Sequence, residues 1–266
     1  GAGSIWSSGT TLTLQGNDRA YMIDDVQASS WPAVRYNKLN LLGKTLKYTA
    51  DFSGVGCGCN AGLYLVAMKS STYSGSGYCD VQMKKEACLE IDLQEGNRKA
   101  MATTLHTRYE FKNATGKPPP LADDVCNQWG CGVNWGKDDD SKYGQHSTTG
   151  IDSARPYDVH AKFDADGRME VALWQDETKR VIWNVTKAGT PNGHAGIPSA
   201  ETARVKKAME DGMVLVVSLW DAPLNNMSWL DGGCTKAYPH CNLASTRALY
   251  TNIRVEANDD AQVEHS

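Results

Sequence analysis

Three carboxylates lie within six residues of this chain, in the order Glu90, Asp92 and Glu95. Like charges held this close repel one another, so a soluble protein has little structural reason to gather them. Two carboxyl groups on one face suit glycoside hydrolysis, in which an ionised carboxylate attacks the sugar and a protonated one donates to the leaving oxygen. The spacing alone also fits a solvated acidic edge strand, because Glu-x-Asp-x-x-Glu is a short and common pattern.

Apolar and polar residues alternate through this segment, which predicts a strand with one polar face. Glu90 and Asp92 would lie on the polar face, and Ile91 and Leu93 on the other. A regular strand would turn Glu95 away from the first two carboxylates. One extra residue, a β-bulge between Asp92 and Glu95, would bring all three carboxylates to the same face.

The length and composition fit one large all-β domain or two small domains, and we expect a single domain over residues 1–266 with no separate binding module or linker. The chain has 266 residues, of which 41% are hydrophobic, enough to form a real core. Its formal net charge is -4, so it lacks the basic surface expected of a nucleic-acid partner. No apolar run is long enough to cross a membrane, and no targeting segment is visible at Gly1.

Short strand-like segments separated by turn signals recur along the chain and predict a β-sandwich. One helix is expected at 199–209, with Ser199 able to cap it and Gly212 able to end it. The expected strands are 11–14, 39–42, 45–50, 62–68, 100–111, 157–163, 169–174, 213–220 and 249–255.

The eight cysteines show no paired Cys-x-x-Cys spacing of a zinc site, so we expect no metal and up to four disulfides. An even number of cysteines favours an oxidising compartment. Three glycosylation acceptors, at Asn113, Asn184 and Asn226, agree with a secreted protein. Eight Trp and eleven Tyr against three Phe also favour amphipathic rings that stack on sugars, although Trp residues serve in cores as well.

Five segments, in order, resemble glycoside hydrolase family 7, which contains secreted endoglucanases and cellobiohydrolases. The segment Glu90–Asn97 is similar to the family's catalytic Glu-Met-Asp-Ile-Trp-Glu-Ala-Asn, and the resemblance runs from about Ile5 to Val255. The other four segments are Cys57–Met68, Gly75–Gln82, Gly212–Asp221 and Met227–Asp231. The resemblance implies a concanavalin-like jelly roll of two curved antiparallel sheets, with a substrate groove on the concave face.

The resemblance also implies roles for individual residues. Glu90 would be the nucleophile, Glu95 the acid/base, and Asp92 the group that orients Glu90 and helps keep Glu95 protonated. His106 lies where the family places a histidine close to the acid/base, or it is a structural histidine. Six residues match the family's substrate-binding positions: Asn60, Tyr64, Asp80 and Gln82 on the glycone side, and the sugar-stacking pair Trp220 and Trp229.

For the strand Val214–Trp220, alternation predicts that Val214, Val216, Ser218 and Trp220 share the groove face, while Leu215, Val217 and Leu219 face the core. By resemblance, the disulfides would join Cys79 to Cys88, Cys126 to Cys131 and Cys57 to Cys241, which leaves Cys59 for Cys234.

The chain also departs from the family. Gln94 replaces the family's catalytic tryptophan, a long loop between Gln82 and Glu86 is missing, and the product-site loop after Cys126–Cys131 is shortened. Without loops that roof a tunnel, we expect an open groove and cleavage inside chains. The departures leave the polymer open: cellulose-type or mixed-linkage glucan, or another β-1,4 polymer such as chitosan.

The main expectation is a secreted, retaining endo-β-1,4-glucanase that acts as a monomer on a polysaccharide and needs no cofactor. A polysaccharide lyase stays open because Gln94, beside the three carboxylates, is a residue type that neutralises charge in such enzymes. A lectin-like binding domain is the third alternative, since the same fold carries lectins. Binding alone does not need three clustered acids, which argues against it.

Overall fold

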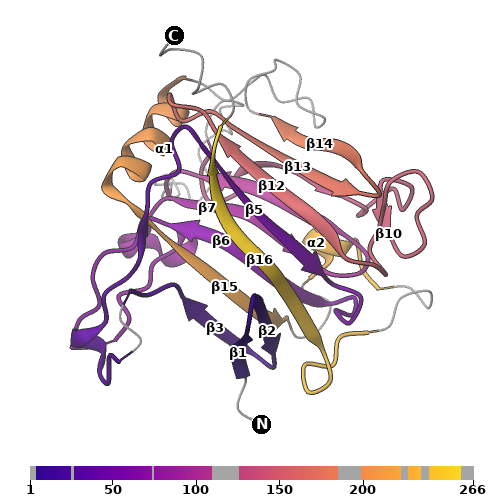
Figure 1. Ribbon diagram of the computed structural model, residues 1–266, viewed down its shortest axis with the longest axis horizontal. Helices are drawn as coiled ribbons and strands as arrows, with labels where there is room; N and C mark the ends of the chain where they lie inside the picture. The colour runs from indigo at the N-terminus through magenta and orange to yellow at the C-terminus, as the bar shows by residue number, and fades with distance from the viewer. Residues whose placement is uncertain are drawn as a thin grey trace, which may run out of the picture.

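The computed structural model describes the chain at residues 4–24, 27–73, 75–109, 126–184, 199–222, 227–234 and 240–258. The described strands form the predicted sandwich of two large sheets, which lie one over the other in Figure 1. All pairings within the two large sheets are antiparallel.

The first sheet, which we call the outer sheet, is nearer the viewer in Figure 1. Its strands are, in spatial order, β1 (Ser4–Ser8), β2 (Thr11–Gln15), β16 (Arg247–Ala257), β5 (Lys44–Asp51), β12 (Tyr157–Phe163), β13 (Met169–Gln175) and β14 (Thr178–Asn184).

The second sheet, which we call the cleft sheet, carries the carboxylates on its central strand β7. Its order is β3 (Asp18–Tyr21), β15 (Met213–Asp221), β6 (Cys59–Val66), β7 (Glu90–Gly96), β8 (Met101–His106) and β9 (Cys131–Trp135), and β4 (Lys38–Leu39) also pairs with β15.

Shorter elements complete the described structure. The predicted helix is confirmed as α1 (Ser199–Asp211), and Gly212, at φ +85°, follows its last residue. The remaining elements are the 3-10 helices η1 (Trp31–Ala33) and η2 (Val81–Glu86), the short helix α2 (Ser228–Asp231), and the parallel pair β10 (Tyr143–Gly144) and β11 (Ile151–Asp152).

The hydrophobic core lies between the two sheets, because apolar and polar side chains alternate along the strands and the apolar ones face the opposite sheet. On β5, Leu46 and Tyr48 are buried in this core, whereas Lys47 between them is more exposed. Strand β6 is buried along its whole length, since Leu63 and Leu65 pack in the core and the alternate residues lie on the cleft side. A strand buried on both faces gives the cleft a fixed floor.

The sequence located the inner strands better than the outer ones. The expected strand 39–42 is reduced to Lys38–Leu39, and the strand expected at 100–111 ends at His106 within the described residues. Strands β1, β14, β3 and β9 were not expected from the sequence, and these four end the two sheets. An edge strand has one neighbour instead of two, so fewer apolar side chains mark it in the sequence.

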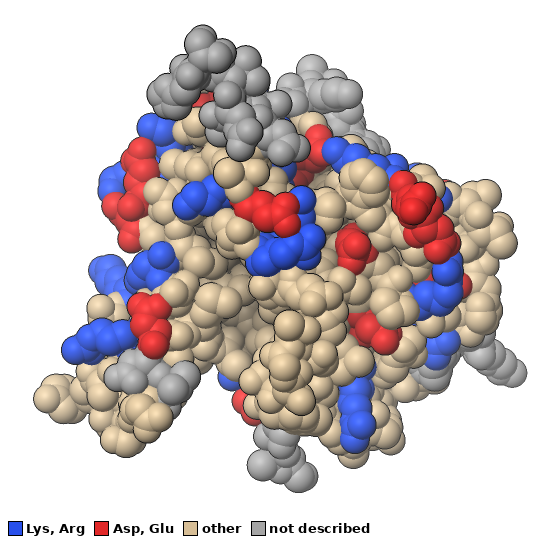
Figure 2. Space-filling view, viewed as in Figure 1, with Lys and Arg blue, Asp and Glu red and all other residues tan. Residues whose placement is uncertain are grey.

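The surface seen in Figure 2 carries acidic and basic side chains interspersed, with no large patch of one sign. Several charged side chains of the described residues form ion pairs, for example Lys47 with Glu256 and Lys179 with Glu170. None of the helices in the described ranges has the length and apolar character needed to cross a membrane.

Candidate active site

A bulge in β7 gathers the three carboxylates, as the sequence predicted. Against β8, Asp92 pairs with Thr104 and Glu95 with Ala102, so three residue steps on β7 match two on β8. The extra residue turns both Leu93 and Gln94 toward the core, where each is fully buried. Glu90, Asp92 and Glu95 therefore all line one cleft, whose volume is about 520 Å³.

Glu90 is held at the entrance to η2. The backbone N–H of Val81 donates a hydrogen bond to its Oε2 at 3.1 Å, and the side chain is largely buried. Asp80 caps the start of the same short helix by accepting a hydrogen bond from the Gln82 N–H. The segment that resembles the family's glycone side thus fixes the orientation of the expected nucleophile.

Asp92 contacts His106 rather than standing alone. Its Oδ2 lies 3.3 Å from Nε2 of His106, and Nδ1 of the same ring lies 2.9 Å from the carbonyl oxygen of Asn127. A carbonyl can only accept, so Nδ1 carries a hydrogen and Nε2 is the atom that faces Asp92. A hydrogen bond between them then needs one further proton, held on Asp92 or on His106.

Glu95 accepts a hydrogen bond from Nδ2 of the fully buried Asn60 at 2.7 Å. His106 therefore touches Asp92, not the expected acid/base, although its positive charge would lower the pKa of Glu95. Asn60 lies one strand away on β6, so the amide fixes the position of the carboxyl across the sheet.

Burial sets the acidity of this cluster. Loss of hydration raises the pKa of all three carboxyls. The charge of Asp92 adds to this effect at Glu90, and the charge of Glu95 adds to it at Asp92. The Val81 N–H and the charge of His106 oppose it at Glu90. The cluster therefore holds protons at a higher pH than separate exposed carboxyls would, as an acid/base that must stay protonated requires.

Most of the residues expected to bind substrate lie in the same cleft. Tyr64, Asp80, Gln82, Trp220 and Trp229 line it, while Asn60 reaches it through Glu95. The prediction for β15 is also confirmed: Leu215, Val217 and Leu219 are in the core between the sheets, whereas Val214 and Val216 pack with Tyr64 on the cleft side. Trp220 and Ser218 line the cleft.

Trp129 is a cleft residue that the sequence reasoning missed. Its side chain is 67% exposed, and it belongs to the short loop closed by the Cys126–Cys131 disulfide. Gly130, at φ +73°, lets this loop press on β8, because a Cβ there would lie 2.2 Å from Cγ2 of Thr104. A tryptophan inside a six-residue disulfide loop is a signal that could have been used, since so short a loop has no core to bury it.

Arg19, Tyr78, Thr104 and Gln128 also line the cleft without having been singled out. Gln128 is tied to the expected site, because its carbonyl accepts a hydrogen bond from Nε2 of Gln82 at 2.7 Å. Arg19 lies on β3, one of the edge strands that the sequence did not reveal. Its place in the cleft could not be foreseen without that strand.

Two of the four expected disulfides are paired differently. Cys79–Cys88 and Cys126–Cys131 are as expected, but Cys57 bonds to Cys234, and Cys59 to Cys241. Gly58 at φ +90° separates Cys57 from Cys59, and its missing side chain faces both partner cysteines. Cys59 points into the sandwich core, against which Cys241 packs, whereas Cys57 faces α2. The expected cross-pairing is therefore wrong.

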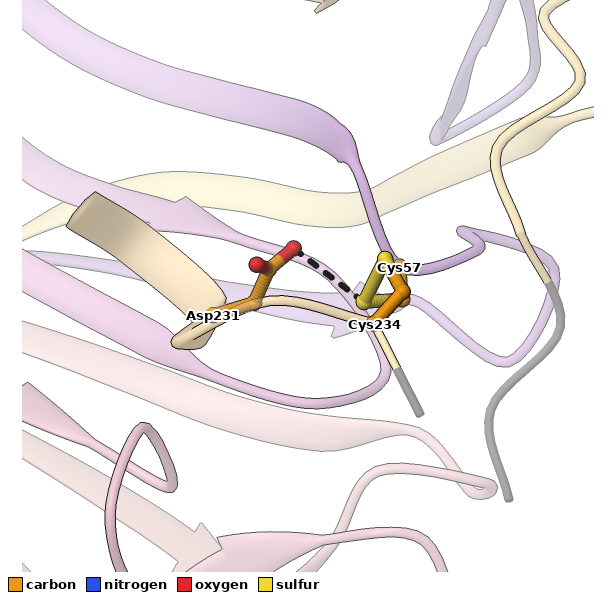
Figure 3. Close-up of side chains that lie close together, drawn as sticks. All are labelled: Cys57, Asp231 and Cys234. Carbon is orange, nitrogen blue, oxygen red and sulfur yellow. Dashed lines mark hydrogen bonds between the residues drawn. A yellow bond between two sulfur atoms is a disulfide. The ribbon is translucent and has the colours of Figure 1, made fainter. Parts of the chain in front are cut away.

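Asp231 lies beside the Cys57–Cys234 disulfide and joins three segments (Figure 3). Its Oδ2 accepts hydrogen bonds from the Gly58 N–H at 2.8 Å and Nδ2 of Asn97 at 3.0 Å, and lies 3.3 Å from Sγ of Cys57. Both sulfur atoms are committed to the disulfide, so this group offers no thiolate to a metal. It instead fixes α2, which carries Trp229, against the ends of β6 and β7.

The comparisons with known proteins agree with this geometry. The chain is 28% identical to endoglucanase EG-1 of Trichoderma longibrachiatum over 95% of its own length, and it spans 62% of that relative. The native endocellulase EGI of Humicola insolens superposes with a TM-score of 0.68 at 22% identity, covering 96% of this chain and 78% of that one. The chain has the fold of glycoside hydrolase family 7.

A family 7 cellobiohydrolase from Daphnia pulex has the same fold, with a TM-score of 0.66 at 20% identity over 95% of this chain and 80% of that one. The expected resemblance to family 7 is therefore confirmed. No protein-family model matches the chain, and it spans less than two thirds of the relative EG-1.

Gln94, at the position of the family 7 tryptophan, does not face the cleft. It is fully buried, and its Nε2 donates a hydrogen bond to Oη of Tyr157, across the core on β12, at 2.6 Å. Tyr157 also contacts Tyr143, whose hydroxyl donates to the carbonyl of Asn97. Gln94 thus belongs to a buried polar network between the sheets, and the argument for a lyase that rested on its proximity to the carboxylates loses its basis.

Proposed function

We propose that this protein is a retaining glycoside hydrolase that cuts β-1,4-glucan inside the chain. The observation that carries the proposal is the β7 bulge, which places Glu90 and Glu95 in one cleft with Asp92 between them in sequence. The names of the relatives, endoglucanase EG-1 and the endo-beta-1,4-glucanase celB of Emericella nidulans, support a glucan as the substrate class.

In the first step, the ionised carboxylate of Glu90 attacks the anomeric carbon, while Glu95 donates its proton to the leaving oxygen. The glycosyl–enzyme bond forms as the glycosidic bond breaks. In the second step, Glu95 takes a proton from water, and the water oxygen displaces Glu90. This scheme expects the two carboxyl groups to lie about 5–5.5 Å apart.

Burial raises the pKa of both Glu90 and Glu95, which suits Glu95 as the proton donor. At Glu90 the hydrogen bond from the Val81 N–H opposes this effect, because it favours the ionised form that a nucleophile needs. Asp92, which lies between Glu90 and Glu95 in the sequence, contacts His106. We assign Asp92 and His106 to positioning and to tuning of acidity.

Aromatic rings in the cleft suit sugar binding. Trp129 and Trp229 are 67% and 43% exposed, and Trp220 is half-buried. Exposed indole rings beside clustered acids match the apolar faces and hydroxyl edges of a sugar chain. We propose that these three tryptophans stack on successive parts of the substrate.

We also propose secretion and action as a monomer. The four disulfides are typical of a protein that folds in an oxidising compartment. Of the three glycosylation acceptors, Asn113 and Asn226 lie outside the described residues. Asn184 is half-buried, and its Nδ2 donates a hydrogen bond to Glu170, so a glycan there would have to displace that contact.

Product analysis on a panel of polymers tests the proposal. The panel is carboxymethylcellulose, mixed-linkage glucan, xylan, chitosan and glucuronan. We expect reducing ends from a β-1,4-glucan, together with a rapid fall in viscosity. Unsaturated products that absorb in the ultraviolet would instead indicate a lyase. Slow loss of viscosity with a single disaccharide product would overturn cleavage inside the chain.

A further inference from the structure

Arg19 lies in one row with the expected acid/base across the cleft sheet. Arg19 on β3 pairs with Ser218 on β15, Ser218 pairs with Gly62 on β6, and Gly62 pairs with Glu95 on β7. Directly paired residues of antiparallel strands point to the same face. Arg19 therefore lies three strand spacings from Glu95, about 14 Å, which a short run of β-1,4-linked sugars can span.

Aromatic side chains hold the guanidinium of Arg19 in place. Its central carbon lies 3.6 Å from the centroid of the Tyr78 ring, and the Tyr78 hydroxyl lies 3.3 Å from that of Tyr64. Burial raises the pKa of both phenols, so they stay uncharged and leave the charge of Arg19 uncompensated. The cation is thus positioned before any ligand arrives, while the residue remains exposed to the cleft.

Arg19 differs from most arginines of the described residues. Arg108, Arg155, Arg168 and Arg254 each form ion pairs with carboxylates. Within the described ranges, no carboxylate lies within ion-pair distance of the Arg19 guanidinium, since the neighbouring Asp18 instead accepts the backbone N–H of Arg19. A stacked, fixed guanidinium that opens onto a ligand cleft suits bidentate binding of a planar carboxylate.

We infer that Arg19 forms a carboxylate-binding subsite at the β3 end of the cleft, which takes a hexuronic acid residue of the polysaccharide chain. This inference rests on the proposed function, because it places the acidic sugar a few residues from the bond that is cut. The enzyme would then prefer β-1,4 chains in which some sugars carry a C6 carboxylate. A fully neutral chain would leave the Arg19 charge without a partner.

Calorimetric titration tests the inference without relying on turnover. The ligands are cellohexaose and matched hexamers in which one glucuronosyl residue is placed in turn at each position. In a Glu90→Gln background, we expect one placement to bind about tenfold more tightly than cellohexaose. Arg19→Gln should abolish that preference. The control Arg35→Gln should keep it, because Arg35 donates hydrogen bonds to the carbonyls of Pro32 and Val34 near the same end and is not among the residues that line the cleft.

Equal binding of every hexamer by the Glu90→Gln protein that retains Arg19 would overturn the inference. An unchanged preference after Arg19→Gln would overturn it as well. Hydrolysis of cellohexaose by the wild-type enzyme is measured alongside. If cellohexaose is cut and no placement is preferred, this inference alone fails. If no hexamer is bound or cut, the proposed function fails and the inference fails with it. A chitosan hexamer tests the sign of the charge at this subsite. Its ammonium groups are repelled by Arg19, so its binding should strengthen after Arg19→Gln.

Discussion

On the outer sheet, Glu256 of β16 is paired with both Lys47 and Arg254 and is exposed to water. On the cleft sheet, Glu90, Asp92 and Glu95 of β7 are buried together, and the one basic side chain within ion-pair distance of them among the described residues is His106. The same residue types are thus exposed and paired with cations on the outer sheet, but buried and clustered on the cleft sheet. Exposed pairs of the first kind contribute little to stability.

The difference appears in acidity. Hydrogen bonds from Lys47 and Arg254 lower the pKa of Glu256, whereas burial raises the pKa of Glu90. A surface carboxylate is thus stabilised in its ionised form, while the β7 carboxylates resist ionisation. Burying ionisable carboxyl groups is unfavourable for folding. Groups whose pKa is shifted by burial therefore tend to cluster at functional sites, and such a cluster identifies a candidate site.

Replacing the expected nucleophile should give the largest effect. Glu90→Gln should lower kcat by about a thousandfold or more, because no glycosyl–enzyme bond can form. Initial rates on a soluble β-glucan measure it. The matched outer-sheet variant Glu256→Gln should keep wild-type kcat. If Glu90→Gln kept more than about a tenth of kcat, less than about 1.4 kcal/mol of barrier would depend on this residue, and its assignment would be abandoned.

Asp92→Asn should lower kcat by about a hundredfold, since the carboxyl groups on either side lose a fixed partner. The same change removes a negative charge beside Glu95. Glu95 then gives up its proton more easily, so the alkaline limb of the pH–rate profile should move to lower pH. Rates across pH measure this shift. An unchanged limb with reduced kcat would mean that Asp92 has a structural role alone.

Trp220→Ala should weaken oligosaccharide binding by about three- to tenfold, because the ring lines the cleft instead of filling the core. Calorimetric titration in the Glu90→Gln background measures the affinity, and a thermal melt measures stability. Trp6→Ala on β1 is the control: Trp6 is 40% exposed and does not line the cleft. A large drop in Tm with unchanged affinity would place Trp220 in the core and remove its stacking role.

The smallest effect expected is on thermal stability, and it should differ in sign between the sheets. The pKa of Glu90 is raised by burial, so above about pH 4.5 the folded protein binds more protons than the unfolded chain, and stability falls as pH rises. Glu90→Gln removes this loss and should raise Tm at pH 7 by a few degrees, about 2–4 °C per kcal/mol, with less gain at pH 4.

Glu256 should behave oppositely in the same melts. Its lowered pKa stabilises the folded protein above the unfolded pKa, and this contribution is lost as pH falls. Glu256→Gln should therefore leave Tm at pH 7 unchanged or slightly lower, because the group is exposed. A Tm of Glu90→Gln below that of the wild type at pH 7 would contradict the account of burial.

The sequence predicted the interior of both sheets and the bulge, because these depend on alternation that is local to each strand. Ile91 and Leu93 had to be buried, so Glu90 and Asp92 had to face the other way. The same reasoning placed Trp220 on the cleft face of β15. The edge strands were not found, because β3 and β9 pack on one neighbour and carry few apolar residues.

What the sequence could not provide depends on contacts between distant segments. The choice between Cys234 and Cys241 as partner of Cys57 is decided by the left-handed turn at Gly58 and by α2, not by any spacing. The burial of Gln94 follows from the bulge together with Tyr157 on the opposite sheet. Arg19 entered the cleft only through the pairing of β3 with β15.

Proton NMR of the first-formed product tests the central claim most directly. The account holds that Glu90 and Glu95 work as nucleophile and acid/base on one face of the bulged strand, through a covalent intermediate. Hydrolysis of a soluble β-1,4-glucan should then release the β-anomer first, followed by slow mutarotation to the equilibrium mixture. First release of the α-anomer would mean a single displacement by water across a wider carboxyl separation, and would contradict the role given to Glu90.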